Sequence, residues 1–378
     1  MKRFLLLFFG LPVFLCALII DHTCTDITRI PESAILAAKD SLHIAYGHTS
    51  HGSQITSGMR GLVAFANGGG KGLPLPENIF DWNNGGTGGA LDLHDYAMDG
   101  DVGYYPQWVN ETRTYLDDPA NSDVNVIMWS WCGQVRGKYA SGVLWDQYLG
   151  PMTELEEDYS HVIFIYMTGH VDIYDDANNK AANDSIRAYC RNNDKVLFDF
   201  ADFDRHDPDG NHYEFCHDDC NYYDAAGGNP LGNWATEWQD KHEEGVDWYA
   251  CGSAHSEPLN ANQKAYGAWW MWASLAGWEG PAKTDEKTDS ENILKLSVDN
   301  NISVISDNPI ELSFSIPEKG LVAVDAYNID GAKISSIFRG NLSAGQHSCS
   351  WDRKGKSGII IIRLKHVSGT ASIKLNCI

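Results

Sequence analysis

Positive charge is scarce in this chain of 378 residues. It has 28 Lys and Arg residues against 51 Asp and Glu residues, which gives a formal net charge of −23. An acidic surface of this kind repels the phosphates of nucleic acids and anionic membranes, so we expect neither as a partner. After residue 20 no apolar run is long enough to cross a bilayer, so we expect no membrane span. The composition suits a soluble exported protein that works on a neutral polymer.

The chain also lacks the ending of a phosphate-binding loop. A glycine-rich turn at 83–90 follows a predicted short strand at 79–82, and its small residues let a backbone approach a ligand closely. No Gly-Lys-Ser/Thr sequence completes this turn, so a nucleotide site is not expected. The function favoured below requires no cofactor.

The first residues have the pattern of an export signal. Met1-Lys2-Arg3 precede an apolar run from Phe4 to Ile20 that carries no charge. We therefore assign residues 1–20 to a signal peptide and expect a secreted or cell-surface protein. The residues before Cys16 match the lipoprotein box poorly, so we do not expect a lipid anchor.

Eight of the nine cysteines follow the predicted signal, and an even number is typical of disulfides in exported proteins. We expect one disulfide between Cys349 and Cys377. Connectivity stays open for the cysteines of one central region, which are Cys190, Cys216, Cys220 and Cys251. Cys132 is either paired or a buried free thiol.

Apolar runs alternate with segments that have helical spacing over residues 21–280. Buried strands are expected at 42–46, 124–131, 162–167 and 196–200, and helices at 54–65, 144–159, 177–192 and 261–278. This alternation predicts an α/β fold, a three-layer α/β/α sandwich with a mainly parallel sheet. Each strand ends in polar or glycine residues, so several loops meet at one edge, where such sheets bind ligands.

The character of the chain changes after a charged linker at 281–292. Apolar and polar residues alternate at 310–316, and 322–327 and 358–365 also resemble strands. Residues 293–378 are therefore predicted to form a separate all-β sandwich.

The turn after the first strand carries the main candidate for catalysis. Ser50 lies in the sequence Gly-His-Thr-Ser-His-Gly at 47–52, between a strand and a helix. A serine there, with histidines close by, is a candidate nucleophile for acyl transfer. The alternative is that the serine only caps the helix. His255, just before the last helix of the domain, is the preferred base, and Asp202, Asp204 or Asp172 would orient it.

Two metal sites are weighed beside this interpretation. The surplus of histidines at strand ends, His48, His51 and His170 with Asp172 or Asp202, is compatible with a transition metal. Oxygen ligands for a structural Ca²⁺ are spaced along a later loop at Asp207, Asp209, Asn211 and Glu214. The same loop also reads as an ordinary turn.

The order of these motifs resembles the SGNH/GDSL hydrolase superfamily over residues 41–278. The resemblance implies Ser50 as nucleophile, His255 as base, and an oxyanion hole from the Ser50 N–H, Gly86 or Gly88, and the Gln134 side chain. His48, His51, His170 and Asp172 would line the substrate site. Three features depart from the family: the first motif is not Gly-Asp-Ser, Gln134 stands where the family has Asn, and Gly252 stands where it has Asp.

The C-terminal module resembles the FlgD-like and type IX secretion sorting domains of exported bacterial enzymes. The likeness rests on Gly345–Asp352, Gly358–Arg363 and Ser372–Leu375, and it implies bacterial secretion machinery as a partner. The sequence thus predicts a secreted serine esterase that removes acyl groups, chiefly acetyl, from a polysaccharide. The alternatives are a metal-dependent enzyme on polysaccharides and a non-catalytic protein that binds sugars.

Overall fold

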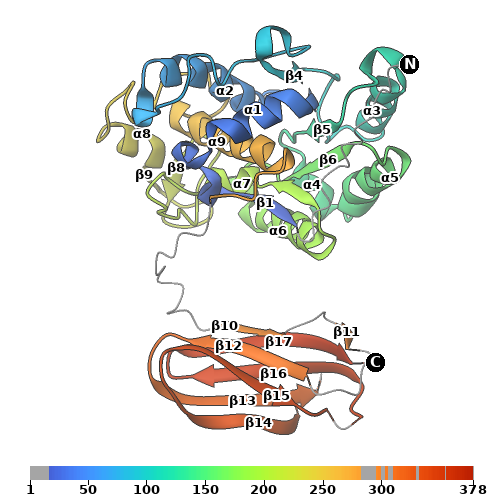
Figure 1. Ribbon diagram of the computed structural model, residues 1–378, viewed down its shortest axis with the longest axis vertical. Helices are drawn as coiled ribbons and strands as arrows, with labels where there is room; N and C mark the ends of the chain where they lie inside the picture. Colours follow the sequence, from blue (N-terminus) through green and yellow to red (C-terminus); the bar gives the residue numbers. More distant parts are fainter. Residues whose placement is uncertain are drawn as a thin grey trace, which may run out of the picture. The chain divides into compact units, whose positions relative to one another are not determined.

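The computed structural model describes residues 17–281, 295–298, 303–304, 310–328, 332–353 and 355–377, and it divides the chain after Pro281 into two units (Figure 1). Residues 1–16, most of the predicted signal, lie outside the described residues, as does most of the predicted linker. No helix among the described residues is long and apolar enough to cross a membrane.

A seven-stranded sheet forms the centre of the first unit, with every neighbouring pair parallel. The order is β1-β7-β6-β5-β2-β4-β3. The strands are β1 Leu18–Ile20, β2 His43–Gly47, β3 Trp82–Asn83, β4 Leu91–Asp95, β5 Val126–Trp129, β6 Ile163–Met167 and β7 Val196–Phe198. The predicted α/β class is therefore confirmed.

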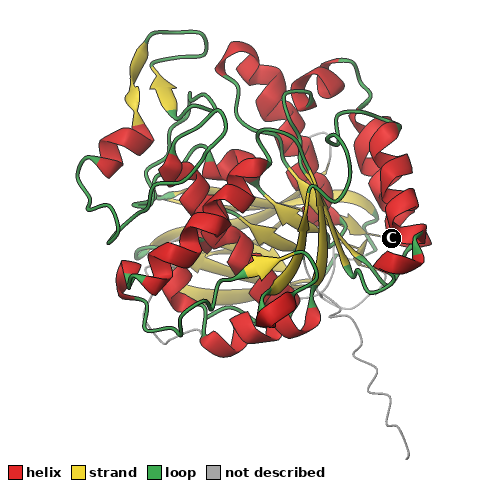
Figure 2. Ribbon diagram, turned by 90° about the horizontal axis from the view of Figure 1, so that it is seen from above, coloured by secondary structure: helices red, strands yellow, loops and turns green. Residues whose placement is uncertain are grey.

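Helices cover the two faces of this sheet (Figures 1 and 2). One group consists of α1 Glu32–Ser41, α2 Ser53–Asn67 and α9 Pro258–Leu275, and the other of α3 Gln107–Asp117, α5 Gly150–Asp158 and α6 Asp176–Asn192. Shorter helices are α4 Val135–Ala140, α7 Phe200–Phe203 and α8 Trp234–Gln239. A two-stranded hairpin, β8 Asn221–Tyr223 with β9 Pro230–Asn233, stands apart from the main sheet. The central strands are buried on both sides, which explains why they read as uninterrupted apolar runs.

Three predicted features of this unit differ from the structure. The apolar run assigned to the signal ends in β1, where Ile20 is fully buried against the sheet, so the folded unit begins before residue 21. The strand predicted at 79–82 is reduced to β3, and β4 was missed because its alternating Leu91-Asp-Leu-His-Asp95 lacks an apolar run. Disulfides are also absent among the described cysteines of this unit, since Cys24, Cys132, Cys190, Cys216, Cys220 and Cys251 are free thiols.

The second unit contains two sheets that share one apolar core. One sheet has β10 Lys295–Val298, β12 Ile310–Ile316 and β15 Gly345–Trp351. The other has β11 Ser303–Val304, β17 Gly369–Cys377, β16 Gly358–His366, β13 Gly320–Asn328 and β14 Lys333–Leu342. Alternate residues of β12, β13 and β16 fill the core between the sheets, as the predicted sandwich requires. The Cys377 side chain lies outside the described residues, so the predicted Cys349–Cys377 pair stays a prediction.

Candidate active site

The topology of the first unit creates a site between β2 and β5. After β2 the chain places β4 on one side of β2 and then crosses over to place β5 on the other side. Ligands bind where the strand order reverses in this way, beyond the carboxyl ends of the strands. The turn after β2 carries Ser50 and His51, and the segment after β5 carries Cys132. The loop after β6 adds His170. Side chains from three neighbouring strand ends are therefore brought together.

Two glycines allow the turn after β2 to lie close to β5. A Cβ on Gly47 would stand 2.5 Å from the Trp129 ring, and one on Gly52 would stand 2.3 Å from Ser130 Oγ. Both distances are shorter than any tolerable contact, so a side chain at either position would push the turn away from Cys132. The glycines of Gly-His-Thr-Ser-His-Gly thus set the position of His51.

A thiol, an imidazole and a carboxylate form a connected row in this site. His51 Nδ1 lies 3.3 Å from Cys132 Sγ, and His51 Nε2 lies 2.8 Å from Asp218 Oδ2. His51 and Asp218 are buried, whereas Cys132 is half-buried and open to a reactant. This is the arrangement of nucleophile, base and orienting acid that activates a nucleophile in acyl transfer.

The charges in this row favour a reactive thiolate. The hydrogen bond from His51 lowers the pKa of the Cys132 thiol to about 7, against the opposing effect of burial. Burial would lower the pKa of His51, but its hydrogen bonds to Asp218 and Cys132 raise that pKa to about 9. Near neutral pH a substantial fraction of the pair is therefore thiolate and imidazolium, the form in which cysteine attacks.

Asp218 is held as an anion by histidines on two sides. It forms a short ion pair with His217 Nδ1 in addition to its bond with His51. Although burial raises the pKa of Asp218, these two histidines hold it well below its usual range. A stable anion beside His51 Nε2 fixes the ring so that Nδ1 faces the thiol.

Three imidazole rings are stacked in this site, with His51 in the middle. His170 lies 4.0 Å from His51 with an interplanar angle of 3°, and His255 lies 4.4 Å away at 15°. Two rings at these distances cannot share one face, so they cover opposite faces of His51. Burial and then the charge on His51 lower the pKa of His170 to about 4, so His170 is neutral.

His255 adopts a backbone conformation that is rare for a residue with a side chain. Its φ is +63°, in the left-handed region, although its side chain is exposed. Such strain tends to be kept at functional positions. The structure therefore brings His255 to the site, as expected from the sequence, but over the face of His51.

Ser50 contacts the thiol, and no histidine is its hydrogen-bond partner among the described contacts. Ser50 Oγ lies 3.6 Å from Cys132 Sγ. The neighbouring Thr49 donates to Asp101, and Gln134 Nε2 lies 3.3 Å from the same Asp101 carboxylate. Gln134 Oε1 accepts from the Cys132 N–H. The predicted Gln134 thus supports the backbone of Cys132, and its own N–H group is engaged by Asp101.

The predicted glycine donors lie at the wrong end of the sheet. Gly86 packs against Asp92, and Gly85 N–H donates to the same carboxylate. Asp92 is near the start of β4 and bonds to His43 at the start of β2. The carboxyl end of β4 is three residues, about 10 Å, further on. The prediction of Gly86 or Gly88 as oxyanion donors is therefore wrong, because β3 was taken for the second strand of the sheet.

The predicted orienting acids have other partners. Asp202 accepts bonds from the backbone and ring of His22. Asp172 pairs with Arg136, and Asp204 pairs with the buried Lys264. Among the described contacts none of these carboxylates bonds to His255, the base that one of them was expected to orient. The imidazole that has an orienting carboxylate is His51, through Asp218.

The predicted calcium ligands do not converge on a common point. Asp207 Oδ1 accepts the N–H groups of Asp209 and Asn211, and its Oδ2 accepts the Asn211 amide and the Tyr213 hydroxyl. Glu214 forms an ion pair with Lys180. This loop is therefore an ordinary Asx turn, the alternative left open above.

The predicted transition-metal set is also divided. His48 bonds to Asp95 at 2.7 Å, away from the other two histidines. His51, His170 and Asp218 do lie close enough to hold an ion. However, both ring nitrogens of His51 are already engaged, by Cys132 and by Asp218. The His170 nitrogen that faces Asp218, Nδ1 at 3.8 Å, carries a proton because it lies 2.7 Å from the Val171 carbonyl oxygen, which only accepts. The group fits a metal less well than it fits the thiol–imidazole–carboxylate row.

Sequence reasoning missed two of the three central residues. Cys132 was expected only as a disulfide partner or a buried free thiol, although it follows a buried strand in Trp-Cys-Gly. Asp218 lies in the irregular segment after α7, where nothing in the sequence distinguishes it from its acidic neighbours. The adjacent His217 is the one local signal of a charged network.

Comparisons with known proteins give no assignment. No known family matches the chain, and no curated protein matches it. Among solved structures the chain is similar to an FMN-binding β-glucuronidase from Facaelibacterium prausnitzii L2-6, at 7% identity and a TM-score of 0.21, over 76% of this chain and 40% of that one. It is also similar to a modular endo-β-1,4-mannanase from Cellulomonas fimi, at 10% identity and a TM-score of 0.18, over 71% and 51% of the two chains. Similarity this low carries no argument about fold or function.

Proposed function

We propose that this protein is an exported hydrolase that cleaves acyl esters, chiefly acetyl esters on a polysaccharide, with Cys132 as its nucleophile. The observation that carries the proposal is the row Cys132–His51–Asp218, with separations of 3.3 and 2.8 Å. Ser50, the nucleophile expected from the sequence, becomes a hydroxyl neighbour of the reacting sulfur.

The reaction has two halves. The Cys132 thiolate attacks the acyl carbonyl carbon, and the His51 imidazolium protonates the departing alcohol, which leaves a thioester on Cys132 and neutral His51. Water then attacks the thioester carbonyl as His51 takes its proton, and the thiolate leaves as the acid is released. Ser50 Oγ, beside the sulfur, is placed to donate a hydrogen bond to the developing oxyanion.

Exposed aromatic rings around the site support a sugar polymer as the substrate. Tyr174 is 79% exposed and packs edge-on against His217, the partner of Asp218. Tyr96 is 57% exposed and packs against His48 in the turn after β2. Rings that are exposed at one end and supported at the other suit contact with the apolar faces of sugars.

The strand order supports the likeness to SGNH hydrolases. The five strands β4-β2-β5-β6-β7 follow the doubly wound order 2-1-3-4-5, with β3 and β1 added at the edges. On this proposal the chain is a distant relative in which a thiol replaces the serine as nucleophile. The C-terminal sandwich would serve secretion or sorting and take no part in catalysis.

A metal-dependent hydrolase is the second candidate, because His51, His170 and Asp218 form a compact group. Acetate release from acetylated xylan and an aryl acetate separates the two candidates. We expect Cys132→Ala and His51→Asn to lose turnover, Ser50→Ala to retain part of it, and a chelator to have no effect. Loss of activity on chelation, with Cys132→Ala still active, would favour the metal. A wild type without activity would reject both and favour a sugar-binding protein.

A further inference from the structure

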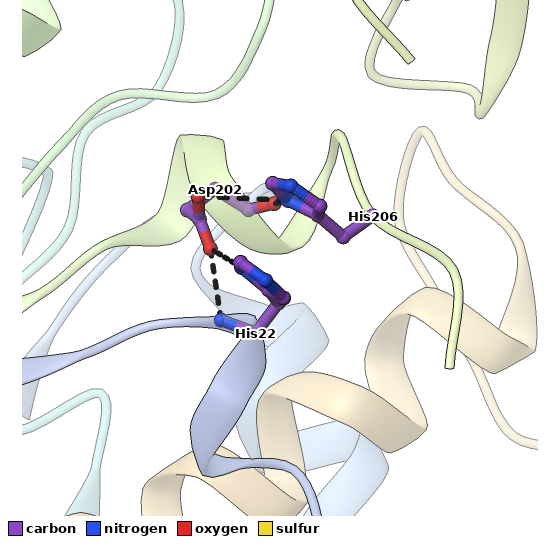
Figure 3. A group of neighbouring side chains, drawn as sticks. All are labelled: His22, Asp202 and His206. Carbon is purple, nitrogen blue, oxygen red and sulfur yellow. Dashed lines mark hydrogen bonds and ion pairs between the residues drawn. The ribbon is translucent and has the colours of Figure 1, made fainter. Parts of the chain in front are cut away.

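A second histidine cluster lies apart from Cys132, at the end of β1 (Figure 3). His22 follows β1, and Asp202 lies in α7 with His206 just beyond it. The site described above uses none of these three side chains. The His22 and Asp202 side chains are 28% and 20% exposed, so the cluster is accessible from solvent.

A single aspartate holds both imidazole rings. His22 Nδ1 lies 2.5 Å from Asp202 Oδ2, and His206 Nδ1 lies 2.8 Å from the Asp202 carbonyl oxygen. Both oxygens act as acceptors, so each Nδ1 carries a proton in the neutral ring and each Nε2 keeps its lone pair. A histidine whose other ring nitrogen is held by a carboxylate or a carbonyl is the usual form of a metal ligand.

The two rings are also parallel and close. Their centroids are 3.6 Å apart with an interplanar angle of 11°, and Figure 3 shows both rings on the same side of Asp202. One ligand atom from each of His22, Asp202 and His206 lies within 4.8 Å of the other two, which is close enough for a single ion to reach all three. Because the rings are stacked, one of them must rotate for both lone pairs to face the ion.

A third imidazole lies beside this pair. His212 pairs with His206 through an isolated β-bridge, and its ring centroid is 4.9 Å from that of His206. A set of nitrogen ligands of this kind selects Zn²⁺, Ni²⁺ or Cu²⁺ over Mg²⁺ or Ca²⁺.

We propose that His22 and His206, oriented by Asp202, bind a first-row transition-metal ion at a site separate from Cys132. The site joins the end of β1 to the segment after α7, so a bound ion would also stabilise the edge of the sheet. This inference does not depend on the proposed hydrolase activity.

The test is calorimetric titration of the full chain, without a polyhistidine tag, with ZnCl₂ and NiCl₂ near neutral pH. The expected result is one equivalent bound with micromolar affinity, lost in His22→Gln and in His206→Gln. Retention in His51→Gln would show that the ion is not held at the Cys132 site. His242→Gln is the matched control, because that ring is likewise stacked, on Trp238, and held at Nδ1 by a carbonyl oxygen.

Thermal unfolding gives a second reading if a variant folds poorly. Saturating Zn²⁺ should raise the melting temperature of the wild type and of His242→Gln, and leave that of the partly exposed His22→Gln unchanged. Binding that persists in both His22→Gln and His206→Gln, or a wild type that takes up no ion, would overturn the proposal.

Discussion

The pH dependence of Cys132 alkylation is the most informative perturbation of the proposed row. The His51 hydrogen bond is the largest contribution that lowers the Cys132 pKa from its ordinary value of 9.0 to about 7. In His51→Asn burial still raises the pKa of the thiol while the Ser50 and Thr49 hydrogen bonds still lower it, so the thiol should titrate close to its ordinary pKa of 9.0.

The expected magnitude follows from the thiolate fraction. At pH 7 this fraction falls from about one half to about one hundredth when the pKa rises from 7 to 9. A more basic thiolate is also more nucleophilic, by about eightfold for this change, so the alkylation rate at pH 7 should fall by about sixfold. The titration midpoint is therefore a sharper readout than the rate.

The assay is the rate of iodoacetamide alkylation against pH, followed by peptide mass spectrometry at Cys132. Other thiols of the first unit provide internal controls, because burial raises the pKa of Cys24 to about 11 and of Cys251 to about 12. Ser50→Ala should move the midpoint less than His51→Asn does, since its bond is a smaller cause. A wild-type midpoint near 9, or one that His51→Asn leaves unchanged, would refute the reasoning.

Three further predictions concern catalysis and stability. A plot of kcat/KM for ester hydrolysis against pH should be bell-shaped, with limbs near the pKa values of Cys132, about 7, and His51, about 9. A flat plot would contradict the thiolate–imidazolium ion pair. Lys264→Met should lower the free energy of unfolding, measured in urea, by about 3–5 kcal/mol, because it leaves the fully buried Asp204 carboxylate without its ion-pair partner. Lys180→Met, at a half-exposed position, should lower the same free energy by less than about 1 kcal/mol. Gly58→Ala should lower the free energy of unfolding by about 1–3 kcal/mol, since its Cβ would stand 2.1 Å from the Ala261 carbonyl oxygen. Gly137→Ala, whose Cβ would have no atom within 4 Å, should not destabilise the protein. Equal melting temperatures for the two variants would contradict this account of the packing.

Much of the fold was predictable because the buried strands carry their signal locally. The runs that became β5, β6 and β7 are uniformly apolar, and α6 keeps its helical spacing over Asp176–Asn192. β4 was not predicted because only alternate residues of this strand face the core. Without β4, the loop expected to supply the oxyanion donors was assigned to the opposite end of the sheet. An error in one strand thus became an error in two site residues.

The candidate site was half predictable for a related reason. Ser50, His51, His170 and His255 lie next to strand or helix ends, and these are the positions that the alternating pattern identifies. Asp218 comes from an irregular segment, and its distance of 2.8 Å from His51 depends on packing that no local pattern encodes. The choice between Ser50 and Cys132 as nucleophile likewise depends on which of the two side chains the His51 ring faces, and His51 Nδ1 faces the Cys132 sulfur.

The measurement that tests the central claim most directly is the identification of the acylated residue. The wild type would be mixed with an aryl acetate, quenched in acid within the first turnover, and digested for mass spectrometry. We predict one acetyl group on the peptide that contains Cys132, present in Ser50→Ala and absent from Cys132→Ala. An acetyl group on Ser50, or full turnover by Cys132→Ala, would contradict the assignment of Cys132 as the nucleophile.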